Sequence, residues 1–583
     1  MTQDPGKEYA GTLPDLKQKG FLSIAANGHD IAVFFHNGQV YALDNRCPHM
    51  GFPLSKGSTK DGILTCDWHH AKFDLKSGGC FDLWAGDVPV FPVHIDNDGK
   101  VWVVVKQDAD RRSQFMDQLQ EGLTQNNSLL IAKSVIGSLS EGVEASELFR
   151  RGIEHGVRYR QDGWGTGLTI LTCMMNLLPY LCAEDRPRAL FHGLSAVAQD
   201  CSGVAPRFPV APLPKAAPDI HTLNRWFRQF VEMRDSDGAE RCLATAIRMG
   251  SQPLQVADML FAAATDHRYL DTGHVLDFTN KAFEALDIVG WEMSEPVLTS
   301  LVPMFAEATR MEERSSWRHP VDIAKILHDC FADLPVALEK GSGKRGNWKR
   351  PDRFGEILLG DNPAEIANTL LSALASGATE EILAQAVTSA SAVRIAQFPT
   401  TNEFSDWDTA LHTFTSANAV TQSLRRLQSA ELLRAVFDVA MSNYINRFLN
   451  VPAVVIPAGL KQPSAGDTMP ASFLELLDKR QQIDEAAKMV AIHLANGGDR
   501  KSLLAMLGKG LLREDRSFHT IQMLEGVTRQ QSLYKEEPQK AAILIIAAAR
   551  YLAAHSATNR SQGQTFDIAS RLQRAGGSYE NIE

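Results

Sequence analysis

The chain has 583 residues, of which 44% are hydrophobic and 22% are charged. These proportions are those of an ordinary globular protein, and the length predicts more than one domain. The formal net charge of −10 gives no basic excess of the kind that binds nucleic acid, so no nucleic-acid partner is expected.

The sequence shows no sign of export or membrane insertion. The first residues lack the charged-then-apolar order of a secretion signal. The longest uninterrupted apolar run, 541–549, is far too short to cross a bilayer. Most of the eight cysteines are scattered without a pattern, which favours reduced thiols over a disulfide framework. We therefore expect a soluble, cytoplasmic protein with no membrane partner.

The N-terminal part reads as β-structure. Short runs of β-branched and aromatic residues recur there, and turn residues such as Asn37-Gly38 separate them. The clearest runs are 31–35, 40–43 and 101–105. They predict a small all-β domain over about 1–107.

Two short motifs in this domain carry thiol and imidazole ligands. Cys47-x-His49 is followed, after a spacer of sixteen residues, by Cys66-x-x-His69. A Rieske [2Fe–2S] centre needs such a set, with two cysteines on one iron and two histidines on the other. Zinc is the alternative, but Cys2His2 zinc sites usually group both cysteines together and both histidines together. Here each loop offers one of each, which favours the iron–sulfur cluster.

The segment 47–74 resembles the Rieske family pattern C-P-H-x-G-x-x-L-x-x-G followed by C-x-x-H-x-x-x-F-D. The resemblance implies a [2Fe–2S] cluster held by Cys47, His49, Cys66 and His69. His70 matches no ligand position of the pattern and is interpreted as a non-ligand. Phe52 follows Gly51 where respiratory members carry an extra cysteine, so the resemblance is to the low-potential, cytoplasmic ferredoxin and oxygenase branch.

From about residue 108 onward, amphipathic helical runs follow one another, with Gly, Pro or Asn at many of their ends. No fixed repeat period supports a regular solenoid. A stretch rich in Pro and Gly, 456–472, is expected to form a surface loop. The predicted fold class is therefore multidomain, with the small all-β Rieske domain followed by a large all-α domain over 108–583.

A cluster that receives electrons needs an acceptor, and the familiar non-haem iron motifs are absent from the helical part. Outside 1–107 no two histidines are four or five residues apart, as a two-histidine, one-carboxylate site usually has them. Neither the Glu-x-x-His of di-iron bundles nor His-Glu-x-x-His occurs there. A second iron would have to be held by histidines that are distant in sequence.

The segment 265–281 is the strongest local candidate, because it contains two histidines, His267 and His274, among several acids. On an unbroken helix these two would lie about 10 Å apart along the axis, too far for one small ion. Gly273 and the polar residues before it predict a helix break that would let both rings converge. Asp277 follows His274 by one turn and would share its face.

Four further histidines lie in predicted helices. His155 follows an acid inside a helix, His192 is in an apolar setting, His412 opens a helical segment, and His519 follows a charged run. For each of them alone, a hydrogen-bonded core or helix-end histidine is the commoner situation. Because imidazole is a good iron ligand, all six stay candidates for a second iron: His155, His192, His267, His274, His412 and His519.

The helical part also resembles, diffusely, the questin-oxidase-like family of all-helical enzymes of aromatic polyketide oxidation. The resemblance rests on His267, Gly273 and the acid-plus-histidine pattern of Asp515 and His519. Some members are iron-dependent ring-cleaving oxygenases with a His-rich site that can include a carboxylated lysine. The resemblance implies His267, His274 and His519 as ligands and makes Lys281 a remote candidate for carboxylation. A fused Rieske domain departs from that family's pattern.

Two hypotheses follow. In the preferred one, the chain is an iron-dependent mono- or dioxygenase that oxidises a small organic substrate with O2 at a His-ligated non-haem iron, and the family resemblance implies that this substrate is aromatic. A separate NAD(P)H-dependent reductase or ferredoxin would supply electrons, because the glycines of 163–167 follow no strand and make no nucleotide fingerprint. In the alternative, the chain is an electron-transfer protein whose helical part is a docking scaffold or redox sensor. By resemblance to Rieske oxygenases, a homo-oligomer is also expected.

Overall fold

The computed structural model describes 6–82, 84–105, 111–214, 218–457, 469–515 and 517–574. By its internal contacts the chain divides into two compact units, Met1–Leu148 with Gln562–Glu583, and Phe149–Ser561. The expected domain boundary at residue 107 lies outside the described residues, as does most of the expected loop at 456–472.

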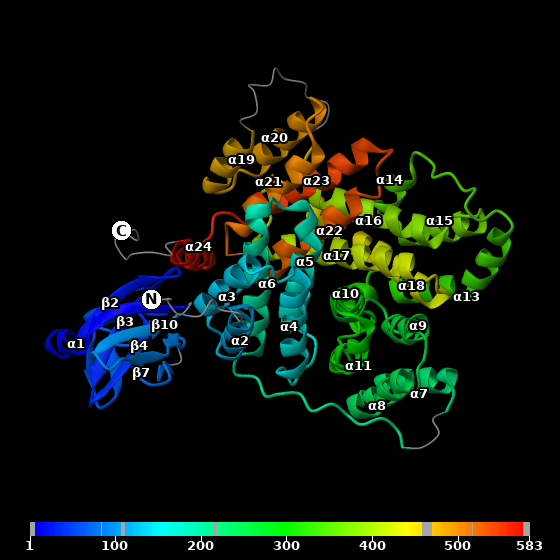
Figure 1. Ribbon diagram of the computed structural model, residues 1–583. Helices are drawn as coiled ribbons and strands as arrows, with labels where there is room; N and C mark the ends of the chain where they lie inside the picture. The colour runs from blue at the N-terminus through cyan, green and yellow to red at the C-terminus, as the bar shows by residue number, and fades with distance from the viewer. Residues whose placement is uncertain are drawn as a thin grey trace. The chain divides into compact units, whose positions relative to one another are not determined.

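The N-terminal unit begins with a domain of short antiparallel strands, drawn in blue in Figure 1. The strands are β1 (Lys7–Thr12), β2 (Phe21–Ala26), β3 (His29–His36), β4 (Gln39–Asp44), β5 (Ser58–Lys60), β6 (Ile63–Thr65), β7 (Lys72–Asp74), β8 (Val90–Phe91), β9 (Val93–Ile95) and β10 (Lys100–Val104). They pair in three sheets, with orders β1-β10-β9, β2-β3-β4-β8 and β5-β6-β7. The three runs expected from sequence coincide with β3, β4 and β10.

The turn between β3 and β4 shows why the sequence specifies this hairpin. Asn37 and Gly38 have φ of 48° and 82°, the two positive values that a two-residue hairpin turn with right-handed twist requires. One departure from an all-β domain is the short helix α1 (Leu13–Lys19), whose first turn is capped by the Thr12 side chain. Leu16 on α1 is fully buried in a core shared with the sheets.

The same unit also contains helices. These are α2 (Arg111–Thr124), α3 (Ser128–Ser140), the start of α4 (Ala145–Arg158) and, from the far end of the chain, α24 (Ser561–Arg574). The unit is therefore larger than the β-domain that carries the ligand motifs.

The second unit is helical in its described residues (Figure 1). Its helices are the rest of α4, α5 (Thr166–Leu177), α6 (Arg186–Cys201), α7 (Ile220–Glu232), α8 (Ser236–Arg248), α9 (Pro253–Ala264), α10 (His274–Val289), α11 (Ser294–Thr299), α12 (Val302–Glu307), α13 (Ile323–Ser342), α14 (Phe354–Leu358), α15 (Pro363–Ala375), α16 (Glu380–Ala396), α17 (Phe404–Arg426), α18 (Ala430–Ile445), α19 (Met469–Asp478), α20 (Ile483–Ala495), α21 (Arg500–Leu512), α22 (Phe518–Gln531) and α23 (Pro538–Ala554). Short 3₁₀ turns join several of them, among them η4 (Leu270–Gly273) and η6 (Met311–Glu313). The expectation of a large helical region is confirmed.

Four helices of this unit form a group that positions the second candidate site. α10 packs against α5 and α17, and α22 packs against α5 and α17. α17 starts with a capping box between Glu403 and Asp406, and the Ser517 side chain caps α22. These caps fix where each helix begins and so which residues face the shared interior.

Among the described residues, none of the helices combines the length and the apolar character needed to span a bilayer.

Candidate metal centres

The first ligand loop follows β4 and contains Cys47 and His49. Its backbone closes into a turn, because the Cys47 N–H donates to the Phe52 oxygen at 2.9 Å and the Gly51 N–H donates to the Cys47 oxygen at 2.8 Å. Gly51 has a φ of 78°, a left-handed conformation that glycine adopts without steric cost. The turn buries Cys47 and leaves His49 half-buried.

The second ligand loop joins β6 to β7 and repeats the same turn. The Cys66 N–H donates to the Ala71 oxygen at 2.8 Å, and the His70 N–H donates to the Cys66 oxygen at 3.0 Å. His70, with a φ of 62°, takes the left-handed position that Gly51 takes in the first loop. Cys66 is buried, whereas His69 is exposed.

The two loops bring the four predicted ligands together. The Cys47 and Cys66 side chains lie in one buried cluster of the β-domain, and their contact lowers the pKa of the Cys66 thiol below its ordinary value. The rings of His49 and His69 meet edge to face, with centroids 4.7 Å apart. Among the described residues, the buried His49 Nδ1 has no hydrogen-bond partner, as a nitrogen reserved for a metal would be. These residues fit a [2Fe–2S] cluster with thiols inward and imidazoles outward.

Two tryptophans surround the outer, histidine side of this centre. The Trp84 ring lies 4.7 Å from the His49 ring, and the Trp68 ring lies 4.4 Å from the His69 ring, centroid to centroid. Both tryptophans are about two-fifths exposed, at 42% and 40%. The imidazole side of the centre therefore faces an exposed aromatic rim, while the thiol side faces the core.

A second group of possible ligands lies in the helical unit. His274 on α10, His412 on α17 and His519 on α22 each offer one ring nitrogen, and these nitrogens lie within 4.8 Å of one another. His412 Nε2 and His519 Nε2 are 2.9 Å apart. Two nitrogens that each bind a metal at about 2.1 Å lie about 3 Å apart when the bonds meet at a right angle. We call His274, His412 and His519 the three-histidine site.

The start of α10 is set by an unusual backbone. Gly273 has a φ of 93°, and Asp271 and Thr272 just before it also have positive φ. A side chain at Gly273 would meet the Ser416 Oγ of α17 at 2.6 Å, so only glycine allows α10 to begin this close to α17. The expected helix break is confirmed, and it places His274 in the first turn of α10.

Asp408 lies one turn before His412 on α17 and contacts the Nδ1 side of the His519 ring. Its Oδ2 is 3.5 Å from His519 Nδ1, and its Oδ1 accepts a hydrogen bond from the Tyr551 hydroxyl at 2.5 Å. Burial alone raises the pKa of Asp408, but the contacts with His519 and Tyr551 outweigh it and lower the pKa overall. A carboxylate on the far nitrogen of a histidine is the usual support of a metal ligand.

Electrostatics favour neutral imidazoles at the site. Burial, and secondarily the neighbouring His519, lower the pKa of His274 to about 4. Burial and the two other rings lower the pKa of His412 to about 3. Neutral imidazole is the form that binds a metal, so both residues fit a metal site at neutral pH.

Farther along α10 and α22 from the three-histidine site, the two helices share buried polar contacts. Gln522 donates to Asp277, the acid expected on the His274 face. Two turns on from His274, Lys281 Nζ donates to Glu284 at 2.9 Å and to Glu525 at 2.8 Å. Burial lowers the pKa of Lys281, but the two carboxylates outweigh it and raise the pKa overall. This protonated, ion-paired amine is not suited to carboxylation, which needs a neutral amine.

The structure does not bring His267 to the three-histidine site, contrary to the expected convergence with His274. His267 Nδ1 lies 2.6 Å from Glu312, and its Nε2 lies 2.6 Å from Glu232. Both nitrogens face carboxylates, and the contact with Glu312 above all raises the pKa of His267. The two carboxylates favour the protonated ring, and an imidazolium has no free lone pair for a metal.

Three other expectations about histidines also need correction. His155 on α4 lies beside the Tyr159 ring, and His192 Nε2 on α6 lies 3.1 Å from the Leu512 carbonyl, so neither belongs to the three-histidine site. His412 does not open its helix but lies two turns inside α17.

Asp408 was not among the residues expected from the sequence. Its spacing of four residues before His412 on one helix nevertheless indicates a shared face.

Comparison with known proteins agrees with the first centre. Residues 9–92 match the Rieske [2Fe-2S] domain family. Apoptosis-inducing factor 3 of Homo sapiens is 29% identical over 183 residues, which are 30% of this chain and 27% of that protein. The chain thus spans about a quarter of that relative. The similarity of the helical part to questin-oxidase-like enzymes stays a prediction, since the family match ends at residue 92.

A ferredoxin component of naphthalene 1,2-dioxygenase/salicylate 5-hydroxylase systems from Ralstonia sp is 31% identical over 90 residues, which are 15% of this chain and 86% of the ferredoxin. Among solved structures, the ferredoxin of carbazole 1,9a-dioxygenase from Nocardioides aromaticivorans IC177 is 24% identical with a TM-score of 0.16, covering 17% of this chain and 98% of the ferredoxin. With its paired ligand loops and these sequence matches, the chain belongs, through its N-terminal domain, to the Rieske [2Fe-2S] family.

Proposed function

We propose that this protein is an oxygenase that takes up electrons through its Rieske cluster and oxidises a small organic substrate with O2 at an iron held by the three-histidine site. The observation that carries the proposal is that His274, His412 and His519 converge from three helices in a chain that also has a Rieske domain. One centre handles single electrons, and the other offers ligands for a metal.

Cys47, His49, Cys66 and His69 would hold the [2Fe–2S] cluster, which supplies one electron at a time when bound. The exposed His69 and Trp68 offer the edge at which a separate NAD(P)H-dependent reductase or ferredoxin would deliver electrons. The two buried cysteines keep the other edge away from water.

In the second site, His274, His412 and His519 would hold an iron, which would supply the O2 chemistry when bound. The chain's own contribution is to orient the ligands. Gly273 lets α10 bring His274 close to α17, and Asp408 holds the far nitrogen of His519. The ligands' half-buried surroundings limit access of water to the reaction.

The substrate class is part of the proposal. A relative of the Rieske domain is named as the ferredoxin component of naphthalene 1,2-dioxygenase/salicylate 5-hydroxylase systems, which supports an aromatic substrate here. The proposed location is the cytoplasm, where the six cysteines other than Cys47 and Cys66 would stay reduced. Homo-oligomerisation stays a prediction.

The test is to measure iron, zinc and acid-labile sulfide per chain on anaerobically purified protein. We expect about two sulfides and about three irons, because the cluster accounts for two of each. Cys66→Ala should lose the sulfide and keep about one iron. His412→Ala should keep the sulfide and the visible spectrum of the cluster but drop to about two irons.

His267→Ala is the matched control, because it removes a histidine that lies outside the three-histidine site. It should keep the metal content of the wild type. Iron and sulfide both near two, with no iron left in Cys66→Ala, would contradict the oxygenase. The electron carrier, which the ferredoxin relatives favour, would then be the function. Zinc in place of the third iron would also contradict the proposed chemistry.

A further inference from the structure

A lysine from outside the matched Rieske segment reaches into the first ligand loop. Lys133 lies on α3, and its Nζ donates to the His49 carbonyl oxygen at 2.7 Å and to the Pro48 carbonyl oxygen. These two carbonyls belong to the residues that directly follow the ligand Cys47. The ammonium therefore holds the short backbone segment that carries Cys47 and His49.

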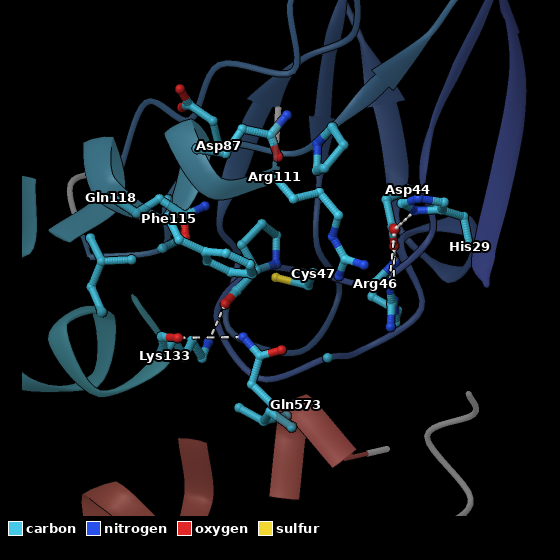
Figure 2. Close-up of a pocket in the computed structure, with 18 residues that line it drawn as sticks. His29, Asp44, Arg46, Cys47, Asp87, Arg111, Phe115, Gln118, Lys133 and Gln573 are labelled. Carbon is cyan, nitrogen blue, oxygen red and sulfur yellow. Dashed lines mark hydrogen bonds and ion pairs between the residues drawn. The ribbon is translucent and has the colours of Figure 1, made fainter. Parts of the chain in front are cut away.

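The two hydrogen-bond acceptors of the Lys133 ammonium are uncharged. Both of its hydrogen bonds in the described residues go to neutral carbonyl oxygens. It lies in the wall of a cavity of about 200 Å³ that Cys47 also lines. In Figure 2 one dashed line joins the Lys133 side chain to a carbonyl oxygen of the ligand loop, and another joins Gln573 to the Lys133 backbone.

α24 contacts α3 at this lysine. The Gln573 side chain donates to the Lys133 carbonyl oxygen at 3.4 Å and lines the same cavity. α2, α3 and α24 thus belong to one compact unit with the β-domain. The position of the ammonium is set by these helices, not by the ligand loops themselves.

A fixed positive charge beside a redox centre stabilises the form with one more electron. The interaction is strong where water is scarce, because the effective dielectric constant is low there. Reduction potentials of iron–sulfur clusters depend on such nearby charges and hydrogen bonds. An ammonium held beside Cys47 would therefore raise the potential of the cluster relative to the same loop without it.

We propose that Lys133 is a positioning residue of the Rieske centre, which holds the first ligand loop through the Pro48 and His49 carbonyls and raises the cluster's reduction potential. This role is independent of the three-histidine site. It makes the helices after the β-domain part of the redox centre, so that the Rieske domain of this chain is not equivalent to a free-standing ferredoxin.

The test compares full-length wild type with Lys133→Met, Lys133→Gln and Lys133→Arg in redox titrations followed by the visible and EPR spectra of the cluster. Sulfide content shows whether the cluster is present. Lys133→Gln keeps a donor but loses the charge, and Lys133→Arg keeps both. Lys76→Met is the control, since it removes an exposed lysine of the same domain.

We expect Lys133→Met and Lys133→Gln to have a lower potential than the wild type, and Lys133→Arg and Lys76→Met to stay near it. Loss of the cluster in the Met and Gln variants, with the cluster retained in the Arg variant, would also support the role. A wild-type potential in a cluster-containing Met or Gln variant would overturn it. Loss of the cluster in the Arg variant as well would show that the site needs the shape of lysine, not its charge, and would overturn it too.

Discussion

Asp408 is the residue through which the three-histidine site is anchored in the helical interior. It faces His519 Nδ1 and accepts a hydrogen bond from Tyr551, while His555 Nε2 lies 3.8 Å from it. A carboxylate in this place selects the tautomer of His519 that leaves Nε2 free, and Nε2 is the atom that faces His412. The aspartate therefore decides which nitrogen the site can use.

This arrangement predicts the effect of Asp408→Asn. The amide keeps the size of the side chain but loses the charge, so it no longer favours the required tautomer. We expect metal affinity at the three-histidine site to fall about 10- to 100-fold, measured by competition with a chelator. The Rieske spectrum should not change.

Asp329→Asn on the exposed face of α13 is the control and should bind metal as the wild type does. An unchanged affinity in Asp408→Asn would mean that Asp408 serves only the packing of Tyr551.

At the scale of elements, the junction of α5, α10 and α22 is held by buried charges. Lys281 is fully buried between Glu284 and Glu525, and Asn176 on α5 donates to both acids. Arg529 on α22 adds a second cation at Glu284, 2.8 Å away. Buried charges like these hold helices in one register because each must keep its partner.

Removal of the central cation tests this junction. Lys281→Met leaves two buried carboxylates with less compensation, and we expect a loss of about 3–5 kcal/mol in the free energy of unfolding. This loss is measured by denaturant titration, with the far-ultraviolet circular dichroism of the helices as the signal. The double variant Lys281→Met, Glu525→Gln should recover part of the loss, because it removes one of the stranded charges.

The exposed lysine variant Lys325→Met should stay within about 0.5 kcal/mol of the wild type. If Lys281→Met were equally mild, the junction would be held by apolar packing and not by its ion pairs.

A second element-scale contact predicts a pH dependence. His267 joins Glu232 at the end of α7 to Glu312 in η6, and Arg310 also pairs with Glu232 at 3.1 Å. The pKa of His267 is raised in the folded state, so its charged form stabilises the fold. This contribution is fully present below the unfolded pKa of about 6.5 and is lost as pH rises through the higher folded value.

His267→Gln should therefore lower the thermal midpoint most at about pH 5.5 to 6 and least at about pH 9. Melting curves of both proteins across this range measure the difference. A difference that grew with pH, or did not change, would show that His267 acts through packing alone.

At the scale of the whole molecule, segments from both ends of the chain form one compact unit. α24 is part of the same compact unit as the β-domain, and its Phe566 and Ala569 are buried on one face. Leu572 and Gln573 line the cavity beside Cys47. The unit that holds the cluster is thus completed by residues more than four hundred positions away.

A chain that ends after Ser561 should consequently lose its cluster at a lower temperature. The burial of one large apolar side chain such as Phe566 contributes about 1.5–3 kcal/mol, and the cavity wall would open as well. The measurement is the bleaching of the cluster's visible absorbance on heating. Gln564→Ala, at an exposed position of α24, should bleach as the wild type does, and equal bleaching of the truncated chain would contradict this role of α24.

The sequence by itself determined the Rieske domain, because the four candidate ligands lie in two short loops. Each loop carries its own turn, so Cys47, His49, Cys66 and His69 are positioned by local geometry that a motif records. The β-domain and the helical region were determined as well, since alternation and helical periodicity are local properties.

Only the tertiary structure decided which histidines meet. His412 and His519 are 107 residues apart, and periodicity says which face of a helix is buried but not which helices share an interior. The pairing of His267 with two acids, the support of His519 by Asp408 and the reach of Lys133 into the ligand loop were likewise decided by packing. Each depends on side chains from separate elements, whose proximity results from the burial of the whole fold rather than from any spacing along the chain.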